Sequence, residues 1–329
     1  MPDSDCYGEG CCLRAGVLSN PRSGGNKKSG GAVRDVLARW PDVVQREAAT
    51  PEGVSRALAD FARNGVDLIV INGGDGTVHA ALTVIGNEGL FPRPPLLALL
   101  CAGTTSMLPR DIGLTGSPAA ALPRVLAWAK SPNAGLVVRS RPVLRVHRSP
   151  DHPPLYGMFF GAGAICQGIK AFHSRDNPMG WRGELMPAVT MLRLLLAILF
   201  KKPGVVPPLL TKTGFDGHPP ERREQLFVLI TTLERLFLGL RPYWGTENGP
   251  LKYTAVGAVP KYLLRVLASL FGSRQSPRAI PENGYTSHNV QEIHLEMAGD
   301  FTLDGELYAA EGGTVRIAAA GPVRFLCQP

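Results

Sequence analysis

The stretch of the chain that most constrains its fold runs from residue 68 to residue 79. It opens with four apolar, mostly β-branched residues, which is the composition of a short buried strand. Gly73, Gly74, Asp75, Gly76 and Thr77 follow, and residues 77–85 then have the composition of a helix. The stretch therefore predicts a strand, a glycine turn and a helix in direct succession.

A turn of this kind suits a phosphate group. Glycines leave no side chain between the backbone and a ligand, and they permit backbone angles that other residues avoid. Free N–H groups and the helix dipole favour an anion at a helix N-terminus. Asp75 fits such a site if a cation bridges its carboxylate to the phosphates, which indicates a Mg-nucleotide site. The alternative is an ordinary strand–turn–helix connection in which Asp75 is a cap.

A second turn, at 20–28, has similar chemistry and follows an expected strand at 14–19. Ser23 and the glycine backbone can donate hydrogen bonds to phosphate, and the turn also carries Arg22, Lys27 and Lys28. The spacing of a Walker loop is absent. On its own, the turn would favour a solvated basic loop over a phosphate site.

The first half of the chain alternates strands and helices, which predicts a parallel sheet with crossover helices. Thr50 and Pro51 have the residue types of an N-cap and a first helical position. A buried strand at 96–101 ends in small and hydroxylated residues at 102–107. Ligands bind beyond the carboxyl ends of strands in such sheets, and three of these ends carry phosphate-type residues.

From about residue 137 the pattern changes to short strand-like runs separated by Gly/Pro turns, which favours antiparallel β structure. The runs are 143–146, 157–160, 226–231, 251–256, 290–295 and 314–318. At 329 residues, two domains are the default expectation. The predicted fold class is α/β plus all-β, with an open parallel-sheet nucleotide-binding domain followed by an antiparallel β-sandwich with inserted helices.

Two apolar stretches, 185–200 and 262–271, stand out in the second half. The first is shorter than the ~20 residues that span a bilayer. Both can be helices packed on the sandwich, or an apolar mouth that touches lipid while basic residues meet anionic headgroups. The formal charge of +8 fits a phosphorylated substrate or an anionic membrane surface. Nucleic acid is the least favoured partner, because the basic residues are scattered and no binding motif is present.

Asp304 and Glu306 form a close carboxylate pair near the C-terminus. On an extended strand both would project to one side, but Gly305 between them makes a turn equally plausible. Such a pair can supply a base and an orienting or metal-linked partner. The alternative is a polar β-turn.

The cysteines form one cluster, Cys6, Cys11 and Cys12, in a Gly-rich leader, where labile thiols are favoured over a zinc site. The acidic start is not followed by an apolar run, so no signal peptide is recognised. We therefore expect a reducing, cytoplasmic location.

These motifs, taken in order, resemble the diacylglycerol kinase catalytic-domain superfamily, which includes bacterial lipid kinases and sphingosine and ceramide kinases. The glycine turn alone also marks NAD kinases and is related to the phosphofructokinase loop. The late Asp-Gly-Glu, beyond a β-rich half, separates the lipid kinases from those relatives. The matching segments are Asn20-Pro21-x-Ser23-Gly24, Gly73-Gly74-Asp75-Gly76-Thr77, Gly103-Thr104 and Asp304-Gly305-Glu306.

The resemblance implies an ATP- and Mg²⁺-dependent lipid kinase that phosphorylates a hydroxyl of diacylglycerol or a related lipid. It also implies an ATP-binding domain at 13–137 after a leader at 1–12, and a lipid-substrate domain at 138–320. The active site would lie in the cleft between the domains, and residues 321–329 would return to the first one.

Residue roles carried over from the resemblance fall into three groups. Glu306 would be the general base on the lipid hydroxyl, with Asp304 beside it. Asp75 would hold Mg²⁺. The nucleotide and its phosphates would contact Asn20, Arg22, Ser23, Gly24, Gly73, Gly74, Gly76, Thr77, Gly103 and Thr104.

The sequence departs from the family pattern at Ser106 and Met107, where Asn-Asp is frequent, and at Ala80, where Glu is frequent. These changes leave the acceptor open. A soluble NAD kinase-type enzyme and a non-catalytic lipid-binding relative are the alternatives. The expected partners are a lipid with a free hydroxyl and, transiently, the anionic inner face of a membrane, without nucleic acid. The oligomeric state stays open, with a homodimer as one option.

Overall fold

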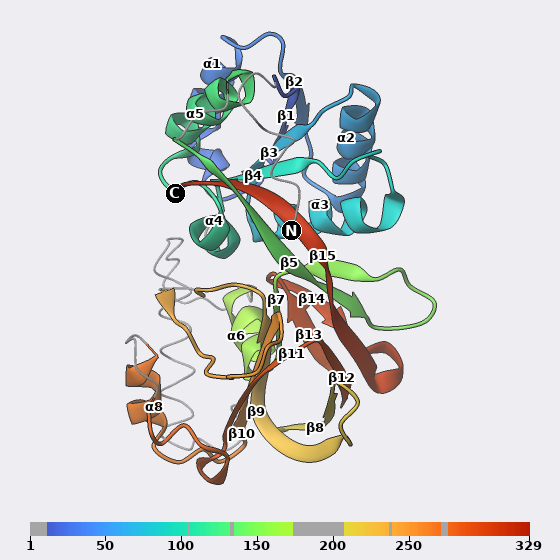
Figure 1. Cartoon of the computed structure of the whole chain (residues 1–329), viewed down its shortest axis with the longest axis vertical. Coiled ribbons are helices and arrows are strands. Elements are labelled where there is room, and N and C mark those ends of the chain that lie inside the picture. Colours follow the sequence, from blue (N-terminus) through green and yellow to red (C-terminus); the bar gives the residue numbers. More distant parts are fainter. Residues whose placement is uncertain (1–11, 104–105, 132–134, 174–206, 237–238, 271–275) are drawn as a thin grey trace. The chain divides into compact units, whose positions relative to one another are not determined.

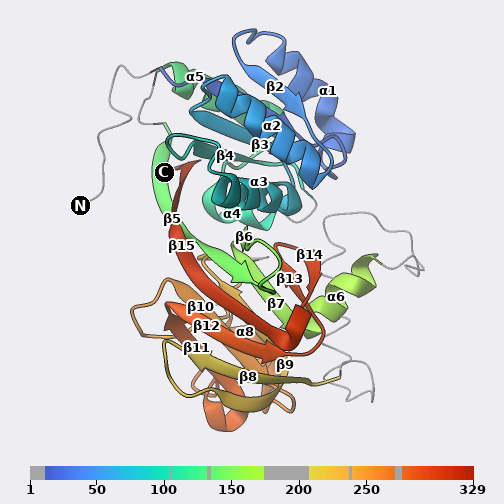
Figure 2. The same cartoon turned by 90° about the vertical axis from the view of Figure 1, so that its right-hand side faces the viewer.

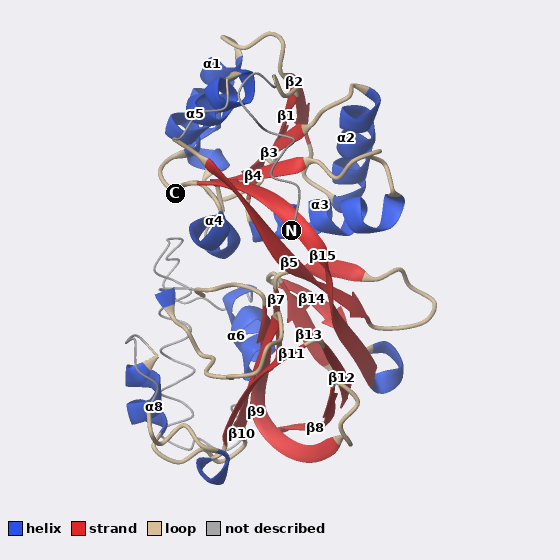
Figure 3. Ribbon diagram, in the orientation of Figure 1, coloured by secondary structure: helices blue, strands red, loops and turns tan. Residues whose placement is uncertain are grey.

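The structure is a computed structural model that describes residues 12–103, 106–131, 135–173, 207–236, 239–270 and 276–329 (Figure 1). The chain divides into two compact units, Met1–Arg141 with Gly321–Pro329 and Pro142–Ala320. The first unit holds a parallel sheet with helices, and the second is built mainly from antiparallel strands (Figure 3). The predicted fold class is confirmed.

The first unit alternates strands and helices along the chain. Its strands are β1 (Ala15–Ser19), β2 (Val44–Glu47), β3 (Leu68–Gly73) and β4 (Leu96–Cys101). Its helices are α1 (Asn26–Leu37), α2 (Pro51–Arg63), α3 (Asp75–Glu88), α4 (Met107–Ile112) and α5 (Pro118–Lys130). The strands pair in parallel in the order β2-β1-β3-β4.

This strand order creates a topological switch point between β1 and β3. The chain leaves β1 to form β2 on one side, and then crosses back to form β3 on the other side of β1. Helices α1 and α5 cover one face of the sheet, while α2 and α3 cover the other (Figure 2). In open α/β sheets the ligand crevice forms at such a point, outside the carboxyl ends of the strands.

The helix starts follow local rules, with two differences from the predictions. Thr50 caps α2 as predicted, because its hydroxyl accepts a hydrogen bond from the Gly53 amide at 3.2 Å. Helix α3 begins at Asp75, two residues before the predicted start, because Gly74 (φ −91°, ψ −179°) is the one residue between it and β3. Helix α1 begins at Asn26, so Lys27 belongs to its first turn and not to the preceding loop.

The second unit is an antiparallel β structure with one larger core. Strand β5 (Val137–His147) enters it and pairs with β6 (Leu155–Gly157). The remaining elements are β7 (Phe159–Gly163), α6 (Ala164–His173), β8 (Leu209–Phe215), β9 (Glu221–Thr231), β10 (Leu251–Gly257), α8 (Leu263–Ser269), β11 (Tyr285–Val290), β12 (Glu292–Met297), β13 (Asp300–Leu303), β14 (Glu306–Ala309) and β15 (Thr314–Cys327), with short 3-10 helices at Pro281–Asn283 and Glu311–Gly313. Inward-facing side chains of these strands, among them Phe160, Tyr253 and Phe301, form the core.

Strand β15 is much longer than the predicted run 314–318. Its first half pairs with β12 in an antiparallel register. Its last residues pair in parallel with β4, where Phe325 lies opposite Leu97, and they belong to the first unit. The side chain of Arg324 also donates to the Pro94 carbonyl at 2.8 Å.

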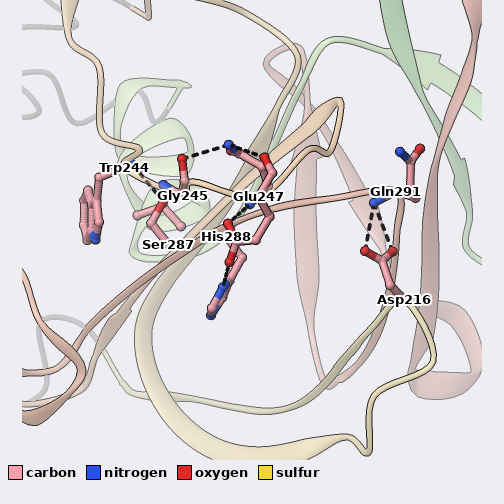
Figure 4. Close-up of polar contacts among 9 residues, drawn as sticks. Asp216, Trp244, Gly245, Glu247, Ser287, His288 and Gln291 are labelled. Carbon is pink, nitrogen blue, oxygen red and sulfur yellow. Dashed lines mark hydrogen bonds and ion pairs between the residues drawn. The ribbon is translucent and has the colours of Figure 1, made fainter.

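The predicted strand 290–295 is wrong as a single element, because the chain turns at Gln291 between β11 and β12. The carboxylate of Asp216 holds this turn by accepting hydrogen bonds from the Gln291 and Glu292 amides at 3.0 and 2.8 Å (Figure 4). Buried side chains continue on both sides of the break, which is why the sequence pattern reads through it.

A loop before β10 is fastened to β11 by polar contacts (Figure 4). Ser287 Oγ accepts hydrogen bonds from the Trp244 and Gly245 amides at 2.9 and 3.2 Å. Glu247 lies 2.6 Å from His288 Nδ1 and accepts from the Asn289 amide at 3.0 Å. This loop is therefore held by side-chain hydrogen bonds instead of strand pairing.

The two apolar stretches have different outcomes. The stretch 185–200 lies outside the described residues, as do Cys6 and Cys11. In the stretch 262–271, the structure forms a short helix, α8, that begins at Leu263. None of the helices in the described ranges has the length and apolar character needed to cross a bilayer.

Candidate active site

The loops after β1 and β3 meet at the switch point of the first unit. The strand register aligns Ser19 of β1 with Asn72 of β3, so the loops that follow these two strands start at the same edge of the sheet. Beyond that level, Asn20 Nδ2 donates to Thr77 Oγ1 at 2.9 Å, and the Gly74 amide donates to Ser23 Oγ at 3.2 Å. The first two predicted phosphate loops are thus in direct contact.

The third loop, after β4, closes against both of the others. The Gly25 amide donates to the Ala102 carbonyl at 2.8 Å. A methyl group added at Gly103 would lie 2.8 Å from the Gly74 Cα atom, nearer than non-bonded carbon atoms approach. One added at Gly73 would lie 2.6 Å from Thr77 Cβ. Neither Gly73 nor Gly74 has a positive φ. Glycine is therefore needed here because the neighbouring loops approach closely, and not because the backbone is left-handed.

Sequence reasoning missed two asparagines that hold this edge together. Asn26 is buried, and its Nδ2 group donates to the Asn20 and Asn72 carbonyls at 2.8 and 2.9 Å. The side chain of Asn72 is buried and donates to Ser19 Oγ at 3.2 Å. For Asn72, the sequence did offer a signal, namely a polar residue directly after the apolar run 68–71. A buried amide at that position needs hydrogen-bond partners.

Ser106 stands where asparagine is frequent in the family that the sequence resembles, and its side chain makes local hydrogen bonds. Its hydroxyl lies 3.0 Å from both the amide nitrogen and the carbonyl oxygen of Gly103. The residue is buried and has φ 45°, the left-handed region. Ser106 therefore folds the loop back on itself immediately before α4.

Asp75 acts as a cap, but for α4 and not for its own helix. Its carboxylate accepts hydrogen bonds from the Met107 and Leu108 amides, each at 3.1 Å. These are the first two residues of α4, whose unpaired N–H groups and positive dipole end favour a carboxylate. Asp75 is 9% exposed, so this contact is largely shielded from water.

The same geometry bears on the predicted Mg²⁺ ligand. Each oxygen of Asp75 already accepts a backbone hydrogen bond, and no group of three or more His, Cys, Asp or Glu side chains converges on a common point within the described ranges. The assignment of Mg²⁺ to Asp75 stays a prediction.

The Asp-Gly-Glu motif forms a β-hairpin turn in the second unit. Strand β13 ends at Leu303 and β14 begins at Glu306, with Asp304 (φ 50°) and Gly305 (φ 95°) between them. Two central residues with positive φ define a type I′ turn, for which Asp-Gly is a favoured sequence. The turn alternative is the correct one, and the extended strand is not.

The two carboxylates of this motif have different surroundings. Asp304 is buried, and its oxygens accept from the Met158 and Phe159 amides at 3.1 and 2.9 Å. A side chain at Gly157 would collide with this carboxylate, so Asp304 can lie this close to the backbone only because residue 157 is glycine. Glu306 is exposed on β14. Asp304 thus fixes the turn to β7, and Glu306 is the carboxylate that solvent or a substrate can reach.

Tyr308 lies on β14 of this hairpin, opposite Phe301. Its ring stacks on Phe301 at 5.7 Å, and the Arg148 guanidinium lies 5.7 Å from the ring centroid. Burial, followed by the nearby Glu306 carboxylate, raises the pKa of Tyr308 to about 12. Tyr308 is therefore a neutral support for the β14 strand at physiological pH.

The predicted site residues fall into two groups, one in each unit. Asp304 and Glu306 belong to the second unit. Thr104 lies outside the described residues. The first unit contains Asn20, Arg22, Ser23, Gly24, Gly73, Gly74, Asp75, Gly76, Thr77 and Gly103, and Arg22 is exposed there.

Comparison with known proteins agrees with this fold and motif order. Residues 14–133 match the family model of the diacylglycerol kinase catalytic domain. A diacylglycerol kinase from Mycobacterium tuberculosis (strain ATCC 25618 / H37Rv) is 30% identical over 182 residues, which are 54% of this chain and 53% of that protein. The chain thus spans about half the length of the curated relatives it matches.

Solved structures share the fold at low sequence identity. A crystal structure of a diacylglycerol kinase from Bacillus anthracis str. Sterne superposes with a TM-score of 0.63 at 16% identity, covering 96% of this chain and 97% of that one. Yeast NADH kinase in complex with NADH gives a TM-score of 0.50 at 12% identity, with coverage of 96% and 84%.

Residues 14–133 of this chain are thus similar to the diacylglycerol kinase catalytic domain.

Proposed function

We propose that this protein is a lipid kinase that transfers the γ-phosphoryl group of ATP to a hydroxyl of diacylglycerol or a related lipid. The observation that carries the proposal is the contact among three glycine-containing loops at the switch point. These loops lie in the segment that matches the diacylglycerol kinase catalytic domain.

The donor side of the proposal uses backbone and cationic groups. Phosphoryl transfer depends mainly on positioning and on neutralising charge. The loops at Gly25, Gly74 and Gly103 pack closely together, and the exposed side chain of Arg22 would supply positive charge beside a triphosphate. The pair Asn20 and Thr77 would hold the two loops at a fixed separation.

The acceptor side uses Glu306. The lipid hydroxyl oxygen attacks the γ-phosphorus, the bond from that phosphorus to the bridging oxygen of ADP breaks, and the Glu306 carboxylate takes the hydroxyl proton. Asp304 would act as a positioning residue, because its carboxylate is occupied by two backbone amides. Glu306, by contrast, is exposed on β14.

Magnesium enters the proposal with the nucleotide. Mg²⁺ in kinases is commonly held by one or two carboxylates together with the substrate phosphates, and it would neutralise phosphate charge here. Since Asp75 caps α4, we assign no step to a metal on that residue.

A lipid acceptor places the proposed reaction in phospholipid metabolism. The enzyme would work from the cytoplasm and associate peripherally with the inner face of the membrane. The formal charge of +8 supports transient attraction to anionic headgroups. The proposal leaves the particular lipid open.

A soluble NAD kinase-type activity is the second candidate, favoured by the structural likeness to yeast NADH kinase. The experiment is a screen of purified protein with γ-labelled ATP, offered a cellular lipid extract or NAD in parallel. We expect label in a lipid phosphate and none in a dinucleotide. Labelled NADP would replace the proposal, and calorimetry without ATP binding would favour a non-catalytic lipid-binding relative.

A further inference from the structure

The second unit carries several exposed apolar side chains in α8 and in the segments that flank it. Six large apolar side chains are exposed within the described ranges, and four of them lie between residues 259 and 280. They are Val259 (78% exposed), Tyr262 (52%), Leu264 (61%) and Ile280 (40%), and we call them the α8 surface. Single exposed apolar residues are ordinary, but such a grouping marks an interaction site.

The backbone beneath the α8 surface is firmly fixed. The Gly257 amide donates to the Gly284 carbonyl at 2.8 Å, and the Lys261 amide donates to the Asn283 carbonyl at 3.0 Å. Tyr285 donates its hydroxyl to the Lys261 carbonyl at 2.8 Å. These bonds join the segment before α8 to the segment that precedes β11.

Helix α8 itself is anchored by its opposite side. Leu263 and Val266 are buried in a small core with Ala279 and Tyr285. Leu264, next to Leu263 along the helix, is 61% exposed. The helix therefore holds Leu264 outward from a packed base, and hydrophobic burial against the described residues does not account for that side chain.

The charges around the α8 surface are mainly positive. Lys261, Arg265 and Arg278 are exposed, against one exposed acid, Glu282, in residues 257–270 and 276–285. The Arg278 guanidinium lies 5.3 Å from the ring centroid of Tyr262, so a cation adjoins an exposed aromatic ring. Aromatic and aliphatic side chains rimmed by Lys and Arg are the composition of an interfacial membrane contact.

We propose that the α8 surface docks this protein on an anionic lipid bilayer, with the four apolar side chains entering the headgroup region and the three cations contacting lipid phosphates. A second copy of the chain fits less well, because a symmetric contact would bring like charges together. The inference rests on the proposed function only in that a lipid acceptor lies in such a membrane.

The test is flotation of the full chain with vesicles of phosphatidylcholine plus phosphatidylglycerol, and with vesicles of phosphatidylcholine alone, without ATP or acceptor lipid. We expect binding to the anionic vesicles. The double variant Val259→Ser/Leu264→Ser should lower the affinity by about tenfold, because less apolar surface leaves water. Leu264→Met is the matched control and should bind as the parent protein does.

The cationic contribution has its own pair of variants. Arg278→Gln should weaken binding to anionic vesicles by about fivefold, and added salt should weaken the parent more than the variant. Arg63→Gln removes an equal charge from an exposed position in the first unit and should leave binding unchanged. A loss as large with Arg63→Gln would overturn a local cationic role.

Two results would overturn the inference. One is equal vesicle affinity of the parent and the Val259→Ser/Leu264→Ser variant, with both folded by circular dichroism. The other is concentration-dependent self-association that the double variant abolishes, which would make the α8 surface a contact between copies. A kinase assay of the double variant with a short-chain, water-soluble diacylglycerol distinguishes failure of the docking inference from failure of the proposed function. Activity in this assay would support the proposed function whatever the vesicle result.

Discussion

At the scale of single residues, Glu306 and Asp304 show how one motif can divide its tasks. Asp304 is buried and accepts two backbone hydrogen bonds, while Glu306 is exposed two residues later. The positive φ of Asp304 and Gly305 turns the chain between them. Proximity in sequence therefore does not make them a functionally equivalent pair.

Glu306→Gln should lower kcat for lipid phosphorylation by about 10²- to 10⁴-fold, because the amide cannot take the hydroxyl proton. The affinity for ATP and the melting temperature should stay near those of the parent, since Glu306 is exposed. Steady-state kinetics with calorimetry measures all three quantities. Glu296→Gln, at an exposed carboxylate paired with Lys212, is the control. Retained turnover in Glu306→Gln would end its assignment as the base.

Gly103→Ala tests the close contact of the loops. Its new methyl group would lie 2.8 Å from the Gly74 Cα atom, so the backbone must move. We expect weaker ATP binding and a loss of about 1–3 kcal/mol in the free energy of unfolding.

Gly30→Ala is the matched glycine control. Gly30 lies in α1 with no atom within 4 Å of an added methyl group. This change should raise stability by about 0.5–1 kcal/mol through helix propensity. Denaturant unfolding compares the two variants, and equal stability of both would contradict the close-contact account.

At the scale of elements, Asp75 links the start of α3 to the start of α4. If this link is its main task, Asp75→Asn should lower stability by about 1 kcal/mol, because an amide oxygen replaces only part of the cap. The Mg²⁺ concentration that gives half-maximal rate should stay unchanged. A titration of rate against Mg²⁺ measures it, with Asp35→Asn, an exposed acid in α1, as the control. A several-fold higher Mg²⁺ requirement would favour a metal ligand.

The loop fastened to β11 supplies a prediction about pH. The hydrogen bond with His288, followed by the Asn289 amide, lowers the pKa of Glu247 from its ordinary value of 4.5 to about 2. A carboxyl with a lowered folded-state pKa stabilises the loop above pH 4.5, and this stabilisation is lost as the pH falls toward about 2. Amide exchange of residues in this loop should therefore rise as the pH is lowered through that window, relative to exchange in β11.

Glu247→Gln removes the titrating group and should abolish the extra rise in amide exchange. The variant should already exchange faster at neutral pH, because the ionised hydrogen-bond acceptor is gone. An identical pH profile in the parent and in Glu247→Gln would contradict the assignment of this effect to Glu247.

The elements of the first unit could largely be predicted, because local signals agree there with tertiary structure. The buried run at 96–101 is β4, and Thr50 caps α2. Prediction failed where a feature depends on contacts between residues far apart in the sequence. The break at Gln291 depends on Asp216, which is 75 residues away in sequence, and the cap of α4 by Asp75 joins residues 32 apart.

At the scale of the whole molecule, the motif order carried more information than any single motif. The three phosphate-type loops were expected on one sheet edge, and the switch point between β1 and β3 explains why two of them meet there. Periodicity could not reveal that β15 pairs with β12 and then with β4, because strand pairing depends on contacts distant in sequence. For the stretch 262–271, the sequence left open a helix packed on the sandwich and a contact with lipid, because the exposure of single side chains such as Leu264 depends on the tertiary structure.

The central claim is that this chain phosphorylates a lipid hydroxyl with ATP. The most direct measurement mixes the purified chain with γ-labelled ATP, Mg²⁺ and diacylglycerol in detergent micelles, and identifies the labelled product by mass spectrometry. The account predicts one labelled phosphate on the free hydroxyl of the lipid, with the yield sharply reduced in Glu306→Gln. Labelled inorganic phosphate alone, or equal lipid labelling by Glu306→Gln, would contradict it.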